Sequence, residues 1–237
     1  MKHPPEPLTD DEMNRLLTAS SNNLFYNTLF QLARNTGRRL GEFYGVQVKI
    51  KIGEVETDKK KKVYTNEGKQ IEVPIKKTLY KYSNKFDYGL KVKDIIFVDD
   101  GTSIMKTWIL KRRNFVQDES IVPREVTNLL KTFIRVNKLT LEDHLFHRVG
   151  YRAIQKAVQS YGKKANINKN VSFHSFRHFF ITDLLKKGWS HDKIKKITGH
   201  KSIMSISSYD HVLTSDLKKQ LLEDLDSQKN PGGSKTF

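Results

Sequence analysis

The 237-residue chain contains no cysteine. A disulfide framework and a thiolate zinc site are therefore excluded, and any catalytic nucleophile has to be an oxygen or a nitrogen atom. Long hydrophobic runs are also missing, and no window approaches the roughly eighteen apolar residues of a membrane-spanning helix. The N-terminal stretch MKHPPEPLTDDEMNRLL carries charges and three prolines where a secretory signal needs an apolar segment. We therefore expect a cytoplasmic protein with no membrane partner.

Acidic residues are few relative to basic ones. The chain has 43 Lys and Arg against 26 Asp and Glu, which gives a formal net charge of +17 and a pI near 9.8. Such an excess is typical of proteins that neutralise phosphate groups, so nucleic acid is the first partner to expect. A lysine-rich solvated surface is the alternative, and a membrane surface is a weaker third. Hydrophobic residues make up 37% of the chain, enough for a buried core.

The order of local patterns predicts an α+β fold that is mainly helical and contains a small antiparallel sheet. Thr9 is a candidate N-cap followed by three acidic residues that suit a first helical turn. A second helix breaks at Thr36-Gly37. Strand-like alternation follows over residues 49–122, with Asn-Glu-Gly and Asp-Gly turns. After Pro123 the pattern is helical again, with helix ends expected near Gly162, Gly188 and Gly199.

Residues 49–93 form a basic insertion that contains thirteen lysines and six acidic residues. Two interpretations remain open for it. One is a solvated hairpin with polar faces. The other is a basic flap that lies on a phosphate backbone, with contacts expected from Lys59, Lys60, Lys61 and Lys62.

The stretch HSFRH places two histidines and an arginine close together. His174 and His178 are four residues apart on a predicted helix, which raises the possibility of a metal site. No glutamate follows His174 and the chain has no cysteine, so we expect no metal. His174 and Arg177 lie three residues apart and share a helix face, which suits two donors directed at one phosphate.

Four stretches, in the order NTGRRLGE, ILKRRNFVQDESIVP, HSFRH and GHKSIMSISSYDHV, resemble the conserved boxes of the tyrosine recombinase and phage integrase family. The resemblance covers about Leu8 to Leu222. In the last box the spacing from His200 to Tyr209 matches the family, and Thr198 stands where the family has leucine. The segment around Tyr209 is too polar for an ordinary core, and the residue by itself leaves open whether this tyrosine packs or reacts.

The resemblance implies a role for each matching residue. Tyr209 is the implied nucleophile, and Arg39 is preferred to Arg38 as the first catalytic arginine because the family places it two residues after the glycine. Lys111 fits the catalytic lysine of a β-hairpin, with Lys106 as the second choice. The other implied residues are the second arginine Arg177, the phosphate-flanking His174 and His200, the supporting Glu42, and the DNA-backbone contacts Arg112 and Arg113.

These residue types also fit phosphodiester chemistry without reference to any family. Attack by a tyrosine places extra negative charge on the non-bridging phosphate oxygens, and two arginines stabilise that charge without a metal ion. The departing 5′-oxygen needs a general acid, which a lysine supplies, while histidines accept the phenol proton or bind the phosphate. A 3′-phosphotyrosine conserves the bond energy, so rejoining requires no cofactor.

The resemblance further implies a domain organisation. Residues 1–225 are expected to form the catalytic domain, residues 226–237 a flexible tail, and an N-terminal core-DNA-binding domain is expected to be absent. Past the tyrosine, a leucine stripe is a candidate for docking into a neighbouring protomer of a tetramer on DNA, with packing on its own domain as the alternative. It consists of Leu213, Leu217, Leu221 and Leu225.

The implied function is site-specific recombination of double-stranded DNA, most simply integration or excision by an integrase of a prokaryotic virus or plasmid. Two alternatives use the same chemistry, namely a chromosome-dimer resolvase and a type IB topoisomerase-like enzyme that relaxes supercoils. A third alternative belongs to another class: a catalytically silent DNA-binding protein on the same scaffold.

Overall fold

The computed structural model describes residues 6–45, 49–82, 88–109, 116–200, 202–207 and 209–210. The helices are α1 (Asp10–Ser20), α2 (Leu24–Thr36), α3 (Leu40–Tyr44), α4 (Arg124–Val136), α5 (Tyr151–Lys164), α6 (Phe173–Lys186), α7 (His191–Thr198) and α8 (Met204–Ser207). The strands are β1 (Lys49–Tyr64), β2 (Gln70–Tyr82), β3 (Ile95–Phe97), β4 (Ser103–Ile109) and β5 (Val116–Val122), with a 3₁₀ turn at Val92–Asp94. The predicted α+β class, mainly helical with antiparallel sheets, is confirmed.

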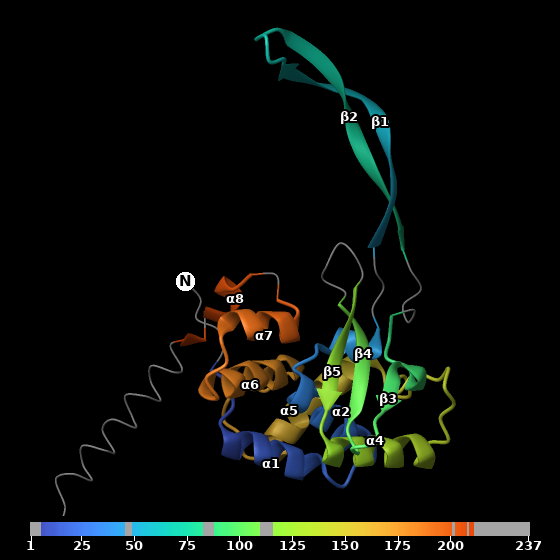
Figure 1. Ribbon diagram of the computed structural model, residues 1–237, viewed down its shortest axis with the longest axis vertical. Helices are drawn as coiled ribbons and strands as arrows, with labels where there is room; N and C mark the ends of the chain where they lie inside the picture. The colour runs from blue at the N-terminus through green and yellow to red at the C-terminus, as the bar shows by residue number, and fades with distance from the viewer. Residues whose placement is uncertain are drawn as a thin grey trace, which may run out of the picture.

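The helices form a body around α2, which packs against α6, α4 and α1 (Figure 1). Aromatic side chains fill the centre of this body, and Phe30, Phe43, Phe133, Phe146 and Phe176 are all buried. A second, smaller core joins the end of α6 to α7 and α8. No helix in the described part of the chain is long and apolar enough to cross a bilayer.

Local signals at the start of the chain act as predicted. The side chain of Thr9 accepts a hydrogen bond from the backbone of Glu12, whose carboxylate accepts one from the backbone of Thr9, so α1 begins with a capping box. Helix α2 ends at Gly37, whose φ of 61° lies in the left-handed region. A Cβ atom at this position would lie 2.4 Å from the ring of Phe180, so a glycine is required here. This turn directs the two arginines that follow it.

Strands β3, β4 and β5 form the predicted small antiparallel sheet. Alternate residues of β4 are buried, starting at Ser103 and ending at Ile109, because one face of the strand packs on the helical body. Strand β5 begins at Val116, earlier than the predicted segment ESIVP, and pairs this residue with Ile109. The sheet places residues 109 and 116 at the same end, beside the connecting segment that contains the proposed catalytic lysine.

The basic insertion folds into a two-stranded antiparallel hairpin that extends away from the helical body (Figure 1). Its turn contains the predicted Asn66-Glu67-Gly68 sequence, with Gly68 at a φ of 76°. The ladder has two irregularities, an extra residue at Ile52 and an unpaired segment between Glu56 and Lys60. The predicted strand–turn–strand pattern is confirmed, and the ribbon is long, since β1 alone contains 16 residues.

One predicted helix end is wrong. Helix α5 does not stop near Gly162 but continues to Lys164. A Cβ at Gly162 would lie 2.8 Å from a methyl group of Val171, so this glycine allows the chain after α5 to pass close to the helix. Packing, and not helix termination, explains the glycine, and the helix ends two residues later.

Candidate active site

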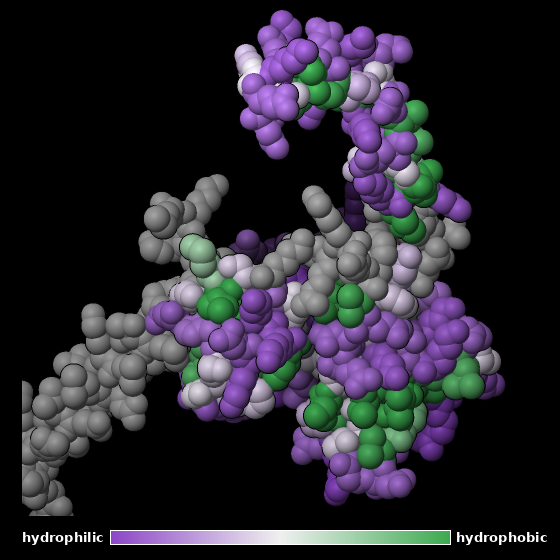
Figure 2. Space-filling view, turned by 45° about the horizontal axis from the view of Figure 1, so that its top comes forward, coloured by the Kyte–Doolittle hydropathy of each residue, from purple (hydrophilic) through white to green (hydrophobic). Residues whose placement is uncertain are grey.

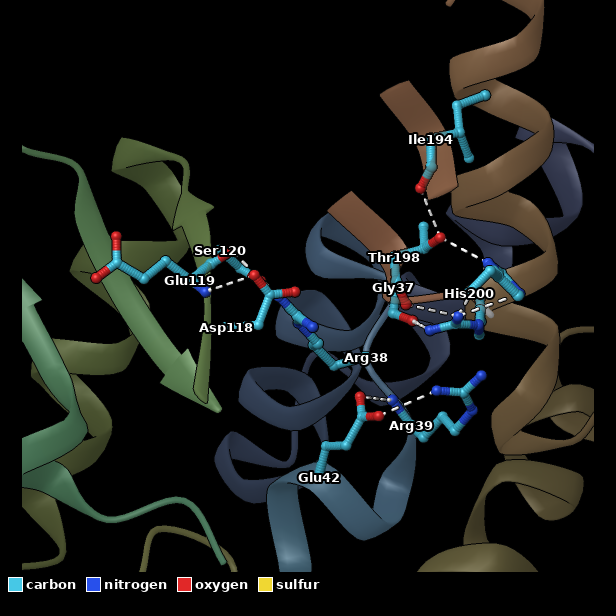
Figure 3. A network of polar contacts seen from close by, with 11 residues as sticks. Gly37, Arg38, Arg39, Glu42, Asp118, Glu119, Ser120, Ile194, Thr198 and His200 are labelled. Atoms are coloured by element: carbon cyan, nitrogen blue, oxygen red, sulfur yellow. Dashed lines mark hydrogen bonds and ion pairs between the residues drawn. The ribbon is translucent and has the colours of Figure 1, made fainter. Parts of the chain in front are cut away.

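Arg38 and Arg39 leave the turn after α2 in different directions (Figure 3). The Arg38 side chain is fully buried, where its Nε donates to Ser120 Oγ at 2.8 Å and its Nη2 donates to Asp118 Oδ2 at 3.0 Å. Arg38 therefore ties the turn to β5. Arg39 Nη1 instead donates to Glu42 Oε1 at 3.1 Å, and the backbone N–H of Arg39 donates to the other carboxylate oxygen at 3.0 Å.

Arg39 lies at the wall of a cleft of about 490 Å³. Its Nε is buried and has no hydrogen-bond partner within the described part of the chain. Glu42 also lines the cleft but is itself 3% exposed, so its carboxylate is committed to Arg39. His174 also lines the cleft, and the remaining lining residues are Leu40, Gly41, Tyr151, Gln155, Gln159, Ser172 and Phe173. The guanidinium of Arg39 is the only cationic group that lines the cleft within the described part of the chain, with Glu42 committed to it and the neutral donors of Gln155, Gln159 and Ser172 nearby, which suits an anionic ligand.

Arg177 projects from α6 and is only 2% exposed. Its Nη1 donates to the carbonyl of Gly37 at 2.9 Å, and its Nη2 donates to the carbonyl of Thr198 at 2.7 Å. Burial, together with the nearby positive charge of Arg39, lowers the pKa of Arg177 to about 10. The group is still charged at neutral pH, so two guanidinium groups from separate segments meet in this region.

His200 follows α7 and contacts both Arg177 and Thr198. The Thr198 hydroxyl donates its single proton to the carbonyl of Ile194 at 2.6 Å, and its oxygen lies 2.6 Å from His200 Nδ1. The network therefore assigns the proton of a neutral ring to Nδ1, which leaves Nε2, 3.2 Å from Arg177 Nη2, as the acceptor. Burial and then Arg177 lower the pKa of His200 to about 3, so the ring is neutral at pH 7.

Tyr209 is 5% exposed and packs with Ile181, Leu184, Leu185, Ile194 and Ile206. The segment was expected to be too polar for an ordinary core, and this expectation is wrong. Two apolar side chains, Ile206 and Tyr209, are enough to close the small core between α6 and α7, while Ser207 is exposed. Packing alone does not account for the tyrosine, however, because its hydroxyl is hydrogen-bonded to Nδ1 of His178.

The Tyr209–His178 pair has shifted ionisation. Burial raises the pKa of Tyr209 to about 12, against the opposing effect of Arg177 and Arg39. Burial, followed by the charges of His174 and Arg177, lowers the pKa of His178 to about 4. Sequence reasoning considered His178 only as a metal ligand. Its position directly after Arg177 and one helical turn after His174 was the available signal, and its ring lies 5.3 Å from that of His174.

The fold thus brings five of the sequence-derived residues into one region, namely Arg39, His174, Arg177, His200 and Tyr209. The cleft itself is lined by only two of these, Arg39 and His174. Lys111, Arg112, Arg113 and the leucine stripe Leu213, Leu217, Leu221 and Leu225 lie outside the described residues. Lys106 lies on β4, where its Nζ is 3.6 Å from Glu119 Oε1.

The remaining predicted residues lie elsewhere. Lys59, Lys60, Lys61 and Lys62 are exposed on β1, in the extended hairpin. Among the residues that the structure describes, no group of three or more His, Asp or Glu side chains is arranged to hold a metal ion.

Comparisons with known proteins give the chain a family. Its residues 6–216 match the family described as "Phage integrase family". Tyrosine recombinase XerD of Staphylococcus epidermidis is 30% identical over 143 residues, which cover 55% of this chain and 48% of XerD. The chain therefore spans about half the length of this curated relative.

Two solved structures have the same fold. A crystal structure of XerA recombinase aligns with 98% of this chain and 65% of its own, at a TM-score of 0.60 and 21% identity. XerH recombinase bound to a palindromic difH substrate aligns with 95% of this chain and 53% of its own, at a TM-score of 0.60 and 18% identity. The matched family covers nearly all of the described residues, including both arginines, the histidines and the tyrosine. The chain belongs to the phage integrase family.

Proposed function

We propose that the protein performs site-specific recombination of double-stranded DNA by cleaving and rejoining strands through a 3′-phosphotyrosine at Tyr209. The observation that carries this proposal is the placement of the tyrosine hydroxyl against His178, on the same helix as Arg177, in a region that also contains Arg39. Family membership supports the same chemistry, and XerH, a relative in fold, has been solved as a post-cleavage complex with its DNA substrate.

The cleavage step follows from the properties of these groups. The Tyr209 oxygen attacks a phosphorus atom of the DNA backbone, a new O–P bond forms, and the bond to the 5′-oxygen breaks. Arg39 and Arg177 stabilise the charge that develops on the non-bridging oxygens, and His174 donates a hydrogen bond to the same phosphate. Neutral His200, whose one ring proton is donated to Thr198, accepts from Arg177 and holds that guanidinium in position. The departing 5′-oxygen takes a proton from a lysine, for which we propose Lys111.

The phenol proton needs an acceptor, because a pKa of about 12 leaves almost no phenolate at neutral pH. We propose that His178 is this acceptor, because its Nδ1 is hydrogen-bonded to the phenol. With a pKa of about 4, the imidazole is neutral at pH 7 and has a nitrogen lone pair available. His178 accepts the phenol proton as the O–P bond forms and returns it to the Tyr209 oxygen when the strands are rejoined. His178 is a weak base, so binding of the phosphate has to lower the cost of this proton transfer.

Rejoining is the reverse reaction on a different strand. A free 5′-hydroxyl attacks the phosphotyrosine, the O–P bond to Tyr209 breaks, and the lysine takes up the hydroxyl proton. The energy of the phosphodiester is kept in the covalent intermediate, so the cycle uses no nucleotide cofactor. The same residues therefore serve both directions.

The biological setting that we propose is integration or excision of a mobile element of a prokaryotic virus or plasmid. A second candidate, chromosome-dimer resolution, is favoured by the similarity to XerD. For both settings we propose a tetramer on DNA, with the leucine stripe docking into a neighbouring protomer, and backbone contacts from Lys59–Lys62, Arg112 and Arg113.

The test is a covalent-adduct assay. The protein and its Tyr209→Phe variant are incubated in EDTA with supercoiled DNA that carries the flanking sequence of the element, and the mixture is denatured with SDS. We expect protein-linked DNA from the parent and none from the variant, and sequencing the linked DNA gives the cleavage site. DNA binding without an adduct from either protein would indicate a silent binder. Relaxation without exchange between two sites would indicate a topoisomerase-like enzyme.

A further inference from the structure

The two faces of the β1–β2 hairpin differ in chemistry. Directly paired residues of an antiparallel ladder share a face, and successive residues alternate between faces. By the observed register, one face carries Val55, Val63, Ile71, Val73, Ile75 and Leu79. We name this the apolar face. The opposite face, named the mixed face, carries most of the polar residues, among them the pair Lys62 and Glu72.

Charge is distributed unequally between these faces. At the paired positions of the apolar face the charged side chains are all lysines, namely Lys61, Lys77 and Lys81. The acidic residues Glu54, Glu56 and Glu72 all lie at paired positions of the mixed face.

On the mixed face, three of the five lysines at paired positions have carboxylate neighbours, and Lys60 is paired with Pro74. Glu54 accepts a hydrogen bond from Lys51, Glu56 is paired with Lys76, and Glu72 is paired with Lys62. Opposite charges directly across a ladder neutralise one another. At the paired positions the apolar face therefore carries three lysines and no acidic residue, whereas the mixed face carries five lysines and three glutamates.

The apolar face is uncovered. Val55 is 46% exposed, and Ile71 and Leu79 are each 42% exposed. Hydrophobic side chains gather along the stem of the hairpin in Figure 2, where no other part of the described chain lies over them. A contiguous apolar strip on an extended ribbon is costly in water and marks a surface that binds a partner.

We propose that the apolar face of this hairpin binds the DNA duplex that flanks the cleaved phosphodiester, an inference that rests on the proposed function. A surface whose charges are all lysine complements a polyanion, and would be poorly matched to a protein surface of mixed charge. A two-stranded ribbon fits the major groove, where methyl and methylene groups contact thymine methyls while lysines at its margins reach the phosphates on either side.

The length and position of the ribbon suit this role. Sixteen residues of β1 span about 50 Å at about 3.3 Å per residue, which corresponds to roughly 15 base pairs. In Figure 1 the hairpin leaves the body on the side where β4 ends and β5 begins, and α8 lies toward the same side. The DNA contacted by the hairpin is therefore flanking DNA, beyond the base pairs at the cleavage site.

The test compares two charge-matched variants of the full chain. Lys61, Lys77 and Lys81 are changed to glutamine in one variant, and Lys51, Lys62 and Lys76 in the other, so both lose three positive charges. The dissociation constant for a long duplex is measured by fluorescence anisotropy over a range of salt concentrations. The logarithm of the association constant falls with the logarithm of the salt concentration, and each lost phosphate contact reduces the magnitude of this slope by about 0.9. We expect the magnitude of the slope to fall by about 2 to 3 for the apolar-face variant and by about 1 for the mixed-face variant, which loses the proposed backbone contact of Lys62.

Duplex length provides an internal control. The difference between the variants should appear with flanks longer than about 15 base pairs and disappear with flanks too short for the ribbon to reach. Equal slopes for the two variants, or a larger fall for the mixed-face variant, would overturn the proposal. So would a doublet of Ile71→Ser and Ile75→Ser that lowers the mass of the protein in solution and leaves DNA binding unchanged, because the face would then bind a second copy of the chain.

Failure of this inference is distinguishable from failure of the proposed function. Adduct formation at Tyr209 is measured on a duplex with short flanks, which the hairpin does not reach. An adduct on this duplex combined with equal salt slopes rejects only the hairpin proposal. Loss of the adduct with unequal slopes rejects the cleavage mechanism and leaves the DNA-binding face in place.

Discussion

Nδ1 of His178 is hydrogen-bonded to the hydroxyl of Tyr209, and this contact joins the middle of α6 to the segment after α7. The tyrosine ring packs into the small core while its hydroxyl is held by the histidine. The residue therefore has a packing role and a chemical role at once. Its hydroxyl is already oriented, which reduces the entropy lost on reaching the geometry of attack.

Replacing His178 with glutamine should slow adduct formation about 10- to 100-fold, since a hydrogen bond of this kind contributes about 1.5–3 kcal/mol when one partner becomes charged. Non-covalent DNA binding should be unchanged. Leucine at this position should slow the reaction more than glutamine, and the rate of both variants should rise more steeply with pH because hydroxide then removes the phenol proton. Parent-like rates and pH profiles for both variants would contradict the role assigned to His178.

The adjacent arginines should behave differently when each is changed to alanine. Arg38→Ala removes a fully buried guanidinium that binds the buried Ser120 and the 29% exposed Asp118, and should cost about 1–3 kcal/mol of unfolding free energy. Arg39→Ala should cost less stability, because its side chain is 17% exposed, and should abolish detectable adduct. Urea denaturation and the adduct assay on the same two proteins separate the effects. A stable, inactive Arg38→Ala protein would reverse the assignment.

Thr198 stands where the family resemblance has leucine, and its hydroxyl fixes the tautomer of His200. Thr198→Val keeps the shape and removes the acceptor, so we expect adduct formation to slow about 5- to 10-fold, in line with about 1 kcal/mol for one hydrogen bond. Thr198→Ser should restore most of the rate. ¹⁵N NMR of the imidazole should report Nδ1–H in the parent and a tautomer mixture in the valine variant, and a mixture already present in the parent would contradict the assignment.

Stability should fall on the acid side because of two histidines. The pKa of His178 is lowered to about 4 and that of His200 to about 3, both mainly by burial, from an ordinary value of 6.5. Between pH 6.5 and 4 the unfolded chain binds protons that the folded chain does not, so the unfolding free energy decreases as pH falls. Each histidine contributes at most about 1.4 kcal/mol per pH unit, reduced by solvent screening. His178→Gln should flatten the pH dependence of urea unfolding, and an unchanged slope would contradict this.

At alkaline pH, Tyr209 determines how the unfolding free energy changes with pH. Its pKa is raised to about 12 by burial, so the unfolded chain releases the phenol proton near pH 10 and the folded chain does so later. The unfolding free energy should therefore fall between pH 10 and 12. Tyr209→Phe should remove that part of the decrease.

Gly37→Ala should be more damaging than Gly188→Ala. Both glycines have positive φ, at 61° and 76°, so alanine is strained by about 1 kcal/mol at either position. Only at Gly37 does the added Cβ meet a side chain, the ring of Phe180 at 2.4 Å, and overpacking adds about 1–3 kcal/mol. The difference between the urea midpoints of the two variants, at constant m-value, measures how much more Gly37→Ala destabilises the protein than Gly188→Ala. Equal midpoints would mean that the Phe180 ring moves aside freely.

Much of the fold was predictable because the local signals agree with the tertiary structure. Thr9 is followed by Glu12 at the spacing of a capping box, Gly37 ends a helix, and the turn glycines separate alternating strands. Gly162 misled the prediction, since a glycine in a helix and a glycine after a helix look alike in sequence. Only the proximity of Val171 distinguishes the two cases.

The site was predictable where the residue spacing of the family pattern identifies single residues. This spacing selected Arg39 over Arg38, and the structure places Arg39, and not Arg38, at the cleft. The contact of Tyr209 with His178 was not predictable, because it depends on how the segment after α7 folds back on α6. The faces of the hairpin were also hidden in the sequence, since the extra residue at Ile52 and the irregular segment before Lys60 reset the alternation of β1.

Arg177 binds the carbonyl of Gly37 across a separation of 140 residues. If α6 or the turn at Gly37 unfolds locally, this hydrogen bond is broken and Arg177 is no longer held beside Arg39. If the protein breaks DNA as proposed, its capacity to do so is lost with the first partial opening of the domain, well before complete denaturation. Damaged or incompletely folded copies would then be inert, and would not act as stray nucleases on the genome around them.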